Sequence, residues 1–494
     1  MNSMLQKAIS EISEIVGSEN ILVEGLELNI QLQNTSHFTA PQVPALVRPA
    51  NDQELDSIIQ ICSACGIPVY TFSKGLNWGL GSRLPLEDGC ILLDLSRLNR
   101  ILEINPKFHY AIVEPGVSQG ELSAEIRRQG LNLMLNVTGS SPNSSVLANM
   151  LERGSGFLAH RLEDLRGLEV LLADGSKMRS GFWNDAHSER EALHFSPGFG
   201  PDWTGIFSQS NLGIVTKAVV NLYPKLELQK MLWCKVEQFR LPELVEAIGE
   251  LYQRKYISSV THIGNDKRMK IEHRGADKVQ TWTSFGSMVQ GTAEYVEFLE
   301  KEIPRVVGNR CLSLGFYNQQ ESEEAGLGAV FGCSTGVPTD YFIKAMYMSE
   351  DMDPDGQNLQ IDHGPLGMLC CLPVLPLQAS AITDTLEILD SIYRDFGIMP
   401  ATTLNPMNDL CLESVINIYF RRNDPQAVSN AHAANKEMTK RFYEAGFRFY
   451  RFDVKLMHEY INPENPHWKF VSRLKKALDP DRILSPGRYE PRVS

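Results

Sequence analysis

The sequence predicts an α+β protein with more than one domain. Its 494 residues are enough for two to four domains and for a large buried core. Up to residue 217, glycine- and serine-rich loops lie between short apolar segments. From residue 228 to about residue 449, helical patterns such as 241–252 and 382–396 alternate with strand patterns such as 414–420, and this alternation indicates a second domain with an antiparallel sheet.

Apolar spacing and stop signals predict the elements of the first half. The N-terminal 17 residues have the pattern of a short amphipathic helix. Asn51 is placed to cap a helix whose apolar residues recur at 55, 58, 59 and 62, and Gly66 suits its C-terminal turn. The other predicted elements are strands at 45–50, 67–72 and 90–95, a hairpin of 101–105 with 110–114, a helix at 119–128 and a strand and turn at 168–176. Near the end of the chain, Pro480 breaks a helix and a turn then presents Arg488.

Composition and charge exclude several classes of protein. The net charge of −13, without a basic cluster, argues against nucleic acid or an anionic membrane as partner. No apolar run approaches the roughly 20 residues of a membrane span, and the N-terminus lacks the apolar core of a secretory signal. Nine scattered cysteines suggest no disulfide framework, and with these features we expect a cytoplasmic protein.

Cysteine and histidine spacing predicts no metal site. Cys62 and Cys65 form a C-x-x-C pattern, but they share a helix with apolar residues and are interpreted as core packing. Cys370 and Cys371 lie in an apolar run and are interpreted as the core of a strand. The eleven histidines show no H-x-x-x-H or H-E-x-x-H spacing, so the sequence predicts no metal.

The loop from Ser73 to Ser82 is the strongest candidate for ligand binding. It holds Gly75, Gly79 and Gly81, and glycine tolerates a positive φ that lets a loop direct its N–H groups to one point. An anion suits that concavity, and a cofactor pyrophosphate is the commonest large one. An ordinary glycine-rich turn between two strands is the alternative. The loop matches neither a P-loop nor a Rossmann turn, which disfavours an ATPase or a nicotinamide site.

Two further loops strengthen the ligand-binding interpretation. Residues 138–157 (TGSSPNSSVLANMLERGSGF) contain many serines and glycines and are too irregular for a core element. Their hydroxyl and N–H groups could bond a phosphate or a polar ring edge, although a serine-rich loop is more often only solvated. Residues 205–217 form another glycine-bearing loop between apolar segments. Three such loops favour one domain that cradles a ligand over three coincidental turns.

Together these stretches resemble the FAD-linked oxidoreductases of the vanillyl-alcohol oxidase and p-cresol methylhydroxylase (PCMH) family. The similarity covers nearly the whole chain and is carried, in the family's order, by Arg48-Pro49, 74–81, 110–117, 149–156, 205–216 and 483–488. The resemblance implies a PCMH-type FAD-binding domain at residues 1–227, completed by the C-terminal segment 450–494. It also implies an α+β cap domain at residues 228–449, which covers the flavin and binds the substrate.

The resemblance also implies roles for particular residues. Tyr450 and Arg451 match a pair that binds a phenolate beside the flavin, and Arg488 matches a further active-site arginine. A cation there would stabilise negative charge on a phenolate or on the reduced flavin. The cofactor-binding residues are expected to be Ser73, Lys74, Gly75, Leu76, Asn77, Trp78, Gly79, Ser82, Ser140, Ser141, Ser145, Asn149, Arg153, Gly154, Gly213, Ile214 and Arg488.

Several positions depart from the family pattern. Leu80 stands where a second phenolate-binding tyrosine is expected, and Glu413 stands in place of a histidine motif. Glu413 is therefore a candidate base, and the alternative is that it only pairs with Arg421 or Arg422. The positions of covalent flavin attachment fall on residues that cannot form the usual bond, so we expect non-covalent FAD; these residues are Gln360, Met368 and Leu76, with His363 as the nearest alternative linker.

The leading hypothesis is an FAD-dependent oxidoreductase that oxidises an organic, aromatic or benzylic, phenol-like substrate by hydride transfer to flavin N5. The substrate is expected to be larger and less phenol-like than p-cresol. The electron acceptor is O2 or another oxidant, and a homodimer is possible for such a chain. One alternative is an FAD-dependent 2-hydroxy-acid dehydrogenase, against which the lack of a histidine-rich metal constellation counts. The other is a flavin-binding protein with altered or lost activity.

Overall fold

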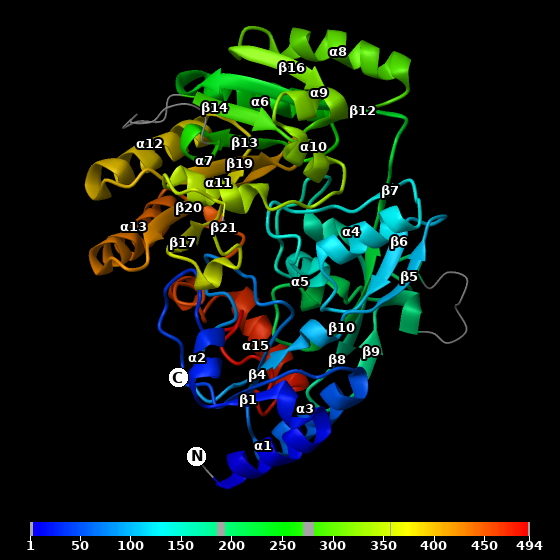
Figure 1. Cartoon of the computed structure of the whole chain (residues 1–494), viewed down its shortest axis with the longest axis vertical. Coiled ribbons are helices and arrows are strands. Elements are labelled where there is room, and N and C mark those ends of the chain that lie inside the picture. Colours follow the sequence, from blue (N-terminus) through cyan, green and yellow to red (C-terminus); the bar gives the residue numbers. More distant parts are fainter. Residues whose placement is uncertain (1–2, 185–192, 270–280, 356, 493–494) are drawn as a thin grey trace.

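The computed structural model describes residues 3–184, 193–269, 281–355 and 357–492. The first part of the chain and its C-terminal helix form the lower half of the molecule in Figure 1, and the middle of the chain forms the upper half. None of the helices in the described part of the chain is long and apolar enough to cross a membrane.

A small sheet at the N-terminal end of the lower half has the strand order β1-β2-β4-β3. The strands β2, β4 and β3 are parallel, and β1 pairs antiparallel to β2. Asn51 caps α3 by accepting a bond from the N–H of Glu54, and Gly66 ends the helix at φ 63°, as the sequence predicts. The bounds are β1 (Ile21–Val23), β2 (Ala45–Val47), β3 (Val69–Phe72), β4 (Ile91–Asp94), α1 (Ser3–Val16), α2 (Leu26–Gln31) and α3 (Asp52–Cys65).

A second, antiparallel sheet of the lower half has the order β5-β6-β10-β8-β9, and β7 pairs with β11 beside it. The predicted hairpin is β5 with β6, and the predicted helix at 119–128 is α4. The sequence missed several short elements of this half, among them α5, which begins at a Ser145 cap inside the stretch that we expected to be irregular. The bounds are β5 (Ile101–Asn105), β6 (Tyr110–Val113), β7 (Leu133–Met134), β8 (Leu165–Leu171), β9 (Lys177–Arg179), β10 (Ile214–Asn221), β11 (Tyr223–Pro224), α4 (Gln119–Arg128) and α5 (Val146–Leu151).

The upper half is built on a large antiparallel sheet with the order β15-β12-β14-β13-β19-β20-β18-β21, to which β16 and β17 add by pairing with β12 and β20. The bounds are β12 (Leu228–Glu237), β13 (His262–Asn265), β14 (Thr281–Phe285), β15 (Met288–Gly291), β16 (Ser313–Tyr317), β17 (Leu366–Cys371), β18 (Pro373–Pro376), β19 (Ala401–Pro406), β20 (Cys411–Arg421) and β21 (Arg448–Phe449). The sheet begins soon after β11, and we keep the division at residues 227 and 228 as a proposal.

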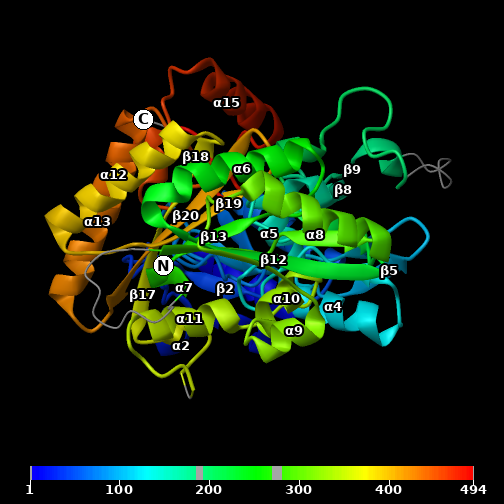
Figure 2. The ribbon, with the colours of Figure 1, turned by 90° about the horizontal axis from the view of Figure 1, so that it is seen from above.

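Helices lie on both sides of this sheet (Figure 2). One row packs on its outer face around an apolar core; it consists of α6 (Leu241–Gln253), α8 (Ala293–Val307), α12 (Ala379–Phe396) and α13 (Pro425–Glu444). The helices α7 (Asp266–Met269), α9 (Gln319–Glu324), α10 (Gly328–Ser334) and α11 (Tyr341–Ser349) lie on the other side. The second core includes side chains of both halves, for example Val220 below with Met231 and Phe285 above. The halves therefore share buried apolar surface.

Side chains of β20 point alternately to the two faces of the sheet, and the two faces have different surroundings. Ile416, Ile418 and Phe420 point into the core beneath the helix row. Asn417 and Tyr419, on the opposite face, line a pocket between the two halves. Because successive side chains of a strand point to opposite faces, one strand serves both the core and the pocket.

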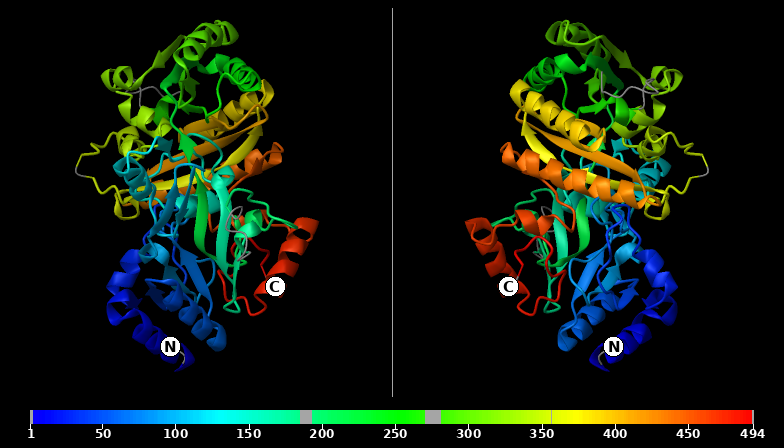
Figure 3. Two further views of the ribbon diagram at one scale, coloured as in Figure 1. Left: turned by 90° about the vertical axis from the view of Figure 1, so that its right-hand side faces the viewer. Right: turned by 90° about the vertical axis from the view of Figure 1, so that its left-hand side faces the viewer.

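The end of the chain returns to the lower half through α14 (Met457–Tyr460) and α15 (Pro466–Leu478), as Figure 3 shows. Leu484 forms a parallel bridge with Val69 of β3. The buried Lys475 ammonium donates to the carbonyl groups of Asn211 and Leu484, at 2.8 and 2.7 Å, and pairs with Asp479 at 2.6 Å. These bonds hold the tail against β3 and bring Arg488 to the pocket.

Candidate active site

One large pocket between the halves brings together most of the predicted site residues. Leu80, Tyr450 and Arg451 line it. Four predicted residues do not line it, namely Gly79, Ser141, Arg153 and Glu413. The predicted cofactor residues that do are Ser73, Lys74, Gly75, Leu76, Asn77, Trp78, Ser82, Ser140, Ser145, Asn149, Gly154, Gly213, Ile214 and Arg488.

The 73–82 loop offers backbone N–H donors to the pocket. They come from residues 74–78 and not from Gly79 and Gly81. The N–H groups of Gly79 and Gly81 donate to the hydroxyls of Thr35 and Ser36, at 2.8 and 3.0 Å. None of the hydrogen bonds within the described chain uses the N–H groups of residues 74–78. Residues 74–78 can therefore bond an anion such as a pyrophosphate.

Gly79 has a packing role instead of a binding role. Its φ is 76°, and a Cβ at this position would lie 2.3 Å from the sulfur of Cys370 in β17. The loop thus packs tightly against the cap sheet where Gly79 meets Cys370. Cys370 itself lines the pocket, so the expectation that both cysteines of this pair are strand core is wrong for Cys370 and correct for the buried Cys371.

The serine-rich loop supplies hydroxyl groups to the same pocket. Ser145 caps α5, and its hydroxyl donates to the carbonyl of Pro115 at 2.6 Å. The buried hydroxyl of Ser144 lines the pocket and has no hydrogen-bond partner among the described residues. Two neighbours face elsewhere, because the Ser141 hydroxyl accepts from Asn143 N–H and Arg153 contacts Ser208. A buried hydroxyl without a partner fits a polar cofactor, which would satisfy it.

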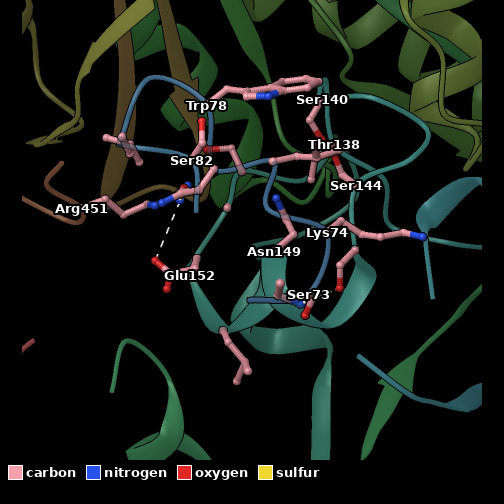
Figure 4. Close-up of a pocket in the computed structure, with 18 of the residues that line it drawn as sticks. Ser73, Lys74, Trp78, Ser82, Thr138, Ser140, Ser144, Asn149, Glu152 and Arg451 are labelled. Atoms are coloured by element: carbon pink, nitrogen blue, oxygen red, sulfur yellow. Dashed lines mark hydrogen bonds and ion pairs between the residues drawn. The ribbon is translucent and has the colours of Figure 1, made fainter. Parts of the chain in front are cut away.

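A cluster of charges lies where the C-terminal tail meets α5. Glu152 pairs with Arg488 at 2.7 Å and with Arg451 at 4.0 Å, and it accepts a bond from the Tyr489 hydroxyl at 2.6 Å. Figure 4 shows Arg451 pointing toward Glu152. Burial would raise the pKa of Glu152, but the two arginines and Tyr489 outweigh it and lower the pKa. The cluster keeps one positive charge in excess at this end of the pocket.

Arg451 is held for contact with a ligand. Its Nη2 donates to the Asn77 side chain of the loop below. Its buried Nε has no partner in the part of the chain that the structure describes. The guanidinium thus joins the 73–82 loop to the tail and keeps a donor for a bound molecule.

Glu413 lies just behind the pocket wall in a chain of polar groups. Its carboxylate accepts from the Ser155 hydroxyl at 2.7 Å and lies 3.1 Å from His160 Nε2. Ser155 and Tyr450 both line the pocket, and both Ser155 and Glu413 influence the pKa of Tyr450. Burial lowers the pKa of His160, but Glu413 outweighs it, so the pKa of His160 is raised.

The alternative that Glu413 pairs with Arg421 or Arg422 is wrong. Arg421 donates to the carbonyl of Glu350, and Arg422 donates to the carbonyls of Asp362 and Gly364. The fold puts His160 of the lower half beside Glu413 because Ser155 and His160 form an isolated antiparallel bridge below the end of β20.

The cap supplies a wall of side chains that sequence reasoning missed. These residues stand on different strands and short helices: His262, Arg268, Thr403, Asn405, Asn417 and Tyr419. The strand pairing aligns Met368 with Tyr419 and Cys370 with Asn417 on one face. The signal for part of this wall is present in 412–420, where polar residues alternate with Leu, Ile and Phe.

The possible attachment positions for FAD have different locations. Met368 lines the pocket, whereas Gln360 and His363 are exposed and do not line it. His363 Nδ1 lies 3.0 Å from the side chain of Gln33. Within the described residues, no cluster of three acidic, histidine or cysteine side chains is arranged to hold a metal ion.

Comparison with known proteins agrees with this geometry. The FAD binding domain family matches residues 43–181. The chain is 26% identical to 1'-carboxy-chondrochloren decarboxylase of Chondromyces crocatus, over 98% of this chain and 97% of that protein. It is also 26% identical to the 4-cresol dehydrogenase [hydroxylating] flavoprotein subunit of Pseudomonas putida, over 98% and 95%. A shorter match, 32% identical over 43% of each chain, is to glycolate oxidase subunit GlcD of Bacillus subtilis.

Two solved structures share the fold over the whole chain. One is p-cresol methylhydroxylase with substrate bound, with a TM-score of 0.86, 24% identity and coverage of 99% of this chain and 97% of that one. The other is 4-ethylphenol oxidase from Gulosibacter chungangensis in its isoeugenol complex, with a TM-score of 0.87, 24% identity and coverage of 100% and 98%.

Proposed function

We propose that this chain, an FAD-dependent oxidoreductase with the fold of the p-cresol methylhydroxylase flavoproteins, oxidises a carbon bonded to a hydroxyl-bearing aromatic ring. We also assign it to the vanillyl-alcohol oxidase group. The position of Tyr450 and Arg451 carries the proposal, because both line the pocket where the FAD-binding loops meet the cap. The names of the 4-cresol dehydrogenase and 4-ethylphenol oxidase relatives support a phenolic substrate.

FAD, when bound, supplies the acceptor for the hydride. We propose that the free N–H groups of residues 74–78 hold its pyrophosphate and that hydroxyls such as Ser144 bond its other polar groups. Gly79, Ser141 and Arg153 leave the predicted binding set, because their side chains or amides are used within the protein.

Tyr450 and Arg451 would hold the oxygen of the substrate. Burial and the nearby Glu413 raise the pKa of Tyr450, so its hydroxyl keeps its proton and can donate a hydrogen bond. Arg451 adds a positive charge and an unused Nε donor. Negative charge that develops on the ring oxygen during oxidation is stabilised by both groups.

Glu413 is the proposed acceptor of the substrate proton. The proposed route leads from Tyr450 to Ser155, which lines the same pocket and whose hydroxyl bonds the Glu413 carboxylate, and from there to His160. The His160 side chain is 24% exposed, so the route reaches solvent. Leu80 in the same pocket offers no hydrogen bond, which leaves the substrate oxygen with fewer donors than a second tyrosine would give.

A second candidate reaction adds loss of CO2, and the whole-chain likeness to a decarboxylase favours it. It requires a carboxylate on the carbon next to the oxidised one. After a hydride leaves the ring-bound carbon and the ring hydroxyl loses its proton, the bond to the carboxylate breaks. Its electron pair forms the second bond of a new C=C between the ring-bound carbon and its neighbour, the ring returns to a phenolate, and CO2 leaves. FAD is the only oxidant needed.

Anaerobic bleaching of the flavin tests these proposals. We expect 4-alkylphenols to bleach the protein and 2-hydroxy acids such as lactate to leave it oxidised. In Arg451→Met, the rate of bleaching should fall about 10²–10³-fold with flavin still bound. In Glu413→Gln the rate should fall at every pH, because the proton acceptor is gone, and Glu437→Gln, on the cap helix α13, is the matched control.

Other outcomes would contradict the proposal in distinct ways. Bleaching by 2-hydroxy acids alone would make the chain a hydroxy-acid dehydrogenase, and bleaching by nothing in a broad panel would favour a binding protein. A Glu413→Gln variant with the wild-type rate at every pH would make Glu413 structural. Measured CO2, in a 1:1 ratio to bleached flavin, would select the second candidate. Re-oxidation in air, compared with an artificial acceptor, identifies the electron acceptor.

A further inference from the structure

The cap end of the pocket holds a cation for which the described residues supply no anionic partner. Arg268 stands in α7 and lines the pocket. Its guanidinium lies over the Phe342 ring, 5.2 Å from the centroid, and its Nη1 lies 3.4 Å from the Tyr419 hydroxyl and 3.5 Å from the Phe342 carbonyl. The ion pairs found within the described residues include no acidic side chain bonded to Arg268, whereas its neighbour Lys267 pairs with Glu350 at 2.6 Å.

The charge of Arg268 acts on the same surface that faces the cofactor loops. Tyr419 and Cys370 both line the pocket, and Arg268 opposes the rise that burial causes in the pKa of each. Cys370 in turn lies against Gly79 of the 73–82 loop. The guanidinium thus faces the pocket from the cap, and it differs from Arg451, whose charge Glu152 partly balances.

A second polar group at this end also lacks a partner. His262 of β13 is 7% exposed and lines the pocket. Its Nδ1 lies 2.7 Å from the Asn405 side chain, but its buried Nε2 bonds no described residue. Burial lowers the pKa of His262 to about 4, so the imidazole is neutral at pH 7 and Arg268 carries the charge. Because buried polar atoms are almost always bonded, the free Nε2 points to a polar group of a bound molecule.

We propose that this end of the pocket is a subsite for a carboxylate of the substrate, bound by Arg268, with a neighbouring polar group of the substrate bonded to His262. The planar guanidinium fork matches a carboxylate, and the Tyr419 hydroxyl lies 3.4 Å from it. Phe285 and Phe342 add apolar surface to this part of the wall, and Arg268 is its only cation among the described residues that line the pocket from the cap. A phosphate dianion would find too few donors there.

The substrate class follows from the two ends together. Arg451 and Tyr450 hold the ring oxygen in the proposed function, on which this inference rests, and Arg268 holds an acid group on the side chain. The substrate is then an aryl alkanoic acid or a larger derivative of one. A carboxylate is also consistent with a substrate less phenol-like than p-cresol. Leu80 donates no hydrogen bond to the ring oxygen, and the bond of the carboxylate to Arg268 compensates for that loss.

Ligand titrations of the FAD-loaded protein test the subsite through the absorbance change of the flavin. One pair of probes is 3-(4-hydroxyphenyl)propanoate and the neutral 4-propylphenol. The other pair lacks the phenol and consists of 3-phenylpropanoate and 3-phenylpropan-1-ol. In Arg268→Met, the Kd of both acids should rise about 10- to 100-fold, while the Kd of both neutral probes changes less than about twofold.

Three variants keep the result interpretable. Arg268→Lys should retain part of the preference for acids, because it keeps the charge and loses the fork. Arg268→Gln replaces Arg268→Met if the latter loses its flavin or its fold. Lys267→Met removes a charge from the same helix but one that faces Glu350, and it should leave all four Kd values unchanged.

The outcomes separate this inference from the proposed function. Equal weakening of acids and neutral probes in both Arg268 variants, or no weakening at all, would overturn the subsite. If phenols neither bind nor bleach, but 3-phenylpropanoate binds in an Arg268-dependent way, the phenol oxidation proposal is wrong and the subsite stands. If phenols bleach the flavin and the binding of acids does not depend on Arg268, the phenol oxidation proposal stands and the subsite is wrong.

Discussion

The two walls of the pocket are built in different ways. The lower wall consists of a few continuous loops, and it offers backbone N–H groups and small hydroxyl side chains. The cap wall consists of single side chains from β13, β17, β19, β20 and α7. A loop of consecutive residues binds one cofactor in a fixed way, whereas separate strand positions can change one at a time. We therefore expect the lower wall to determine the cofactor and the cap wall to determine the substrate.

The largest expected effect concerns the chemical link between cofactor and cap. We expect acid precipitation to release all of the FAD into the supernatant, because Met368 and Leu76, the candidate linking positions that line the pocket, cannot form the usual bond. Absorbance of supernatant and pellet measures this. Flavin that stays in the pellet and maps to a His363 peptide would mean that His363 leaves its contact with Gln33.

The contact between the two walls should be the next most sensitive point. In Gly79→Ala, the new Cβ meets the Cys370 sulfur, so we expect the free energy of unfolding to fall by about 1–3 kcal/mol beyond the cost of the positive φ, with loss of FAD. Gly89→Ala is the control, because Gly89 has φ 83° and open space around it. It should cost only about 1–2 kcal/mol. Adding Cys370→Ala should remove the excess in urea unfolding, and an unchanged excess would contradict the packing role.

The charge cluster of the lower wall should give a pH-dependent effect. Replacing Glu152 by Gln leaves Arg488 and Arg451 without their partly buried carboxylate, so we expect a loss of about 1.5–3 kcal/mol at pH 7. The pKa of Glu152 is lower in the folded state than the unfolded value of 4.5. Its stabilisation is therefore present above pH 4.5 and is lost as the pH falls through the folded pKa. Urea unfolding against pH should show the difference between variant and wild type shrinking below pH 4.5, and a constant difference would contradict this.

The smallest expected effect belongs to the cap wall. Tyr419→Phe removes a hydroxyl that lies 3.4 Å from Arg268 and should leave FAD content and melting temperature unchanged. The Kd of 3-phenylpropanoate should rise about threefold, as for loss of one weak hydrogen bond. Loss of flavin in this variant would contradict the separation of roles between the two walls.

The sequence by itself determined most of the lower wall. The glycine positions, the serine-rich stretch and the cap residue Asn51 act through local backbone geometry, which neighbours along the chain decide. Together with the family resemblance, these local rules were enough to predict the fold class, the FAD cofactor and most of the loop residues that line the pocket. They did not reveal that the N–H groups of Gly79 and Gly81 are used by Thr35 and Ser36, because those partners lie more than 40 residues away.

The tertiary structure alone decided the cap wall. Alternation along β20 gives the strand two different faces. The pairing with β17 and the row of helices behind the sheet then decide which face lines the pocket, opposite the 73–82 loop. His160 became the partner of Glu413, and Arg268 became a pocket residue, through contacts between segments far apart in the chain. Such contacts depend on how sheets and helices pack, and no local pattern in the sequence records that packing.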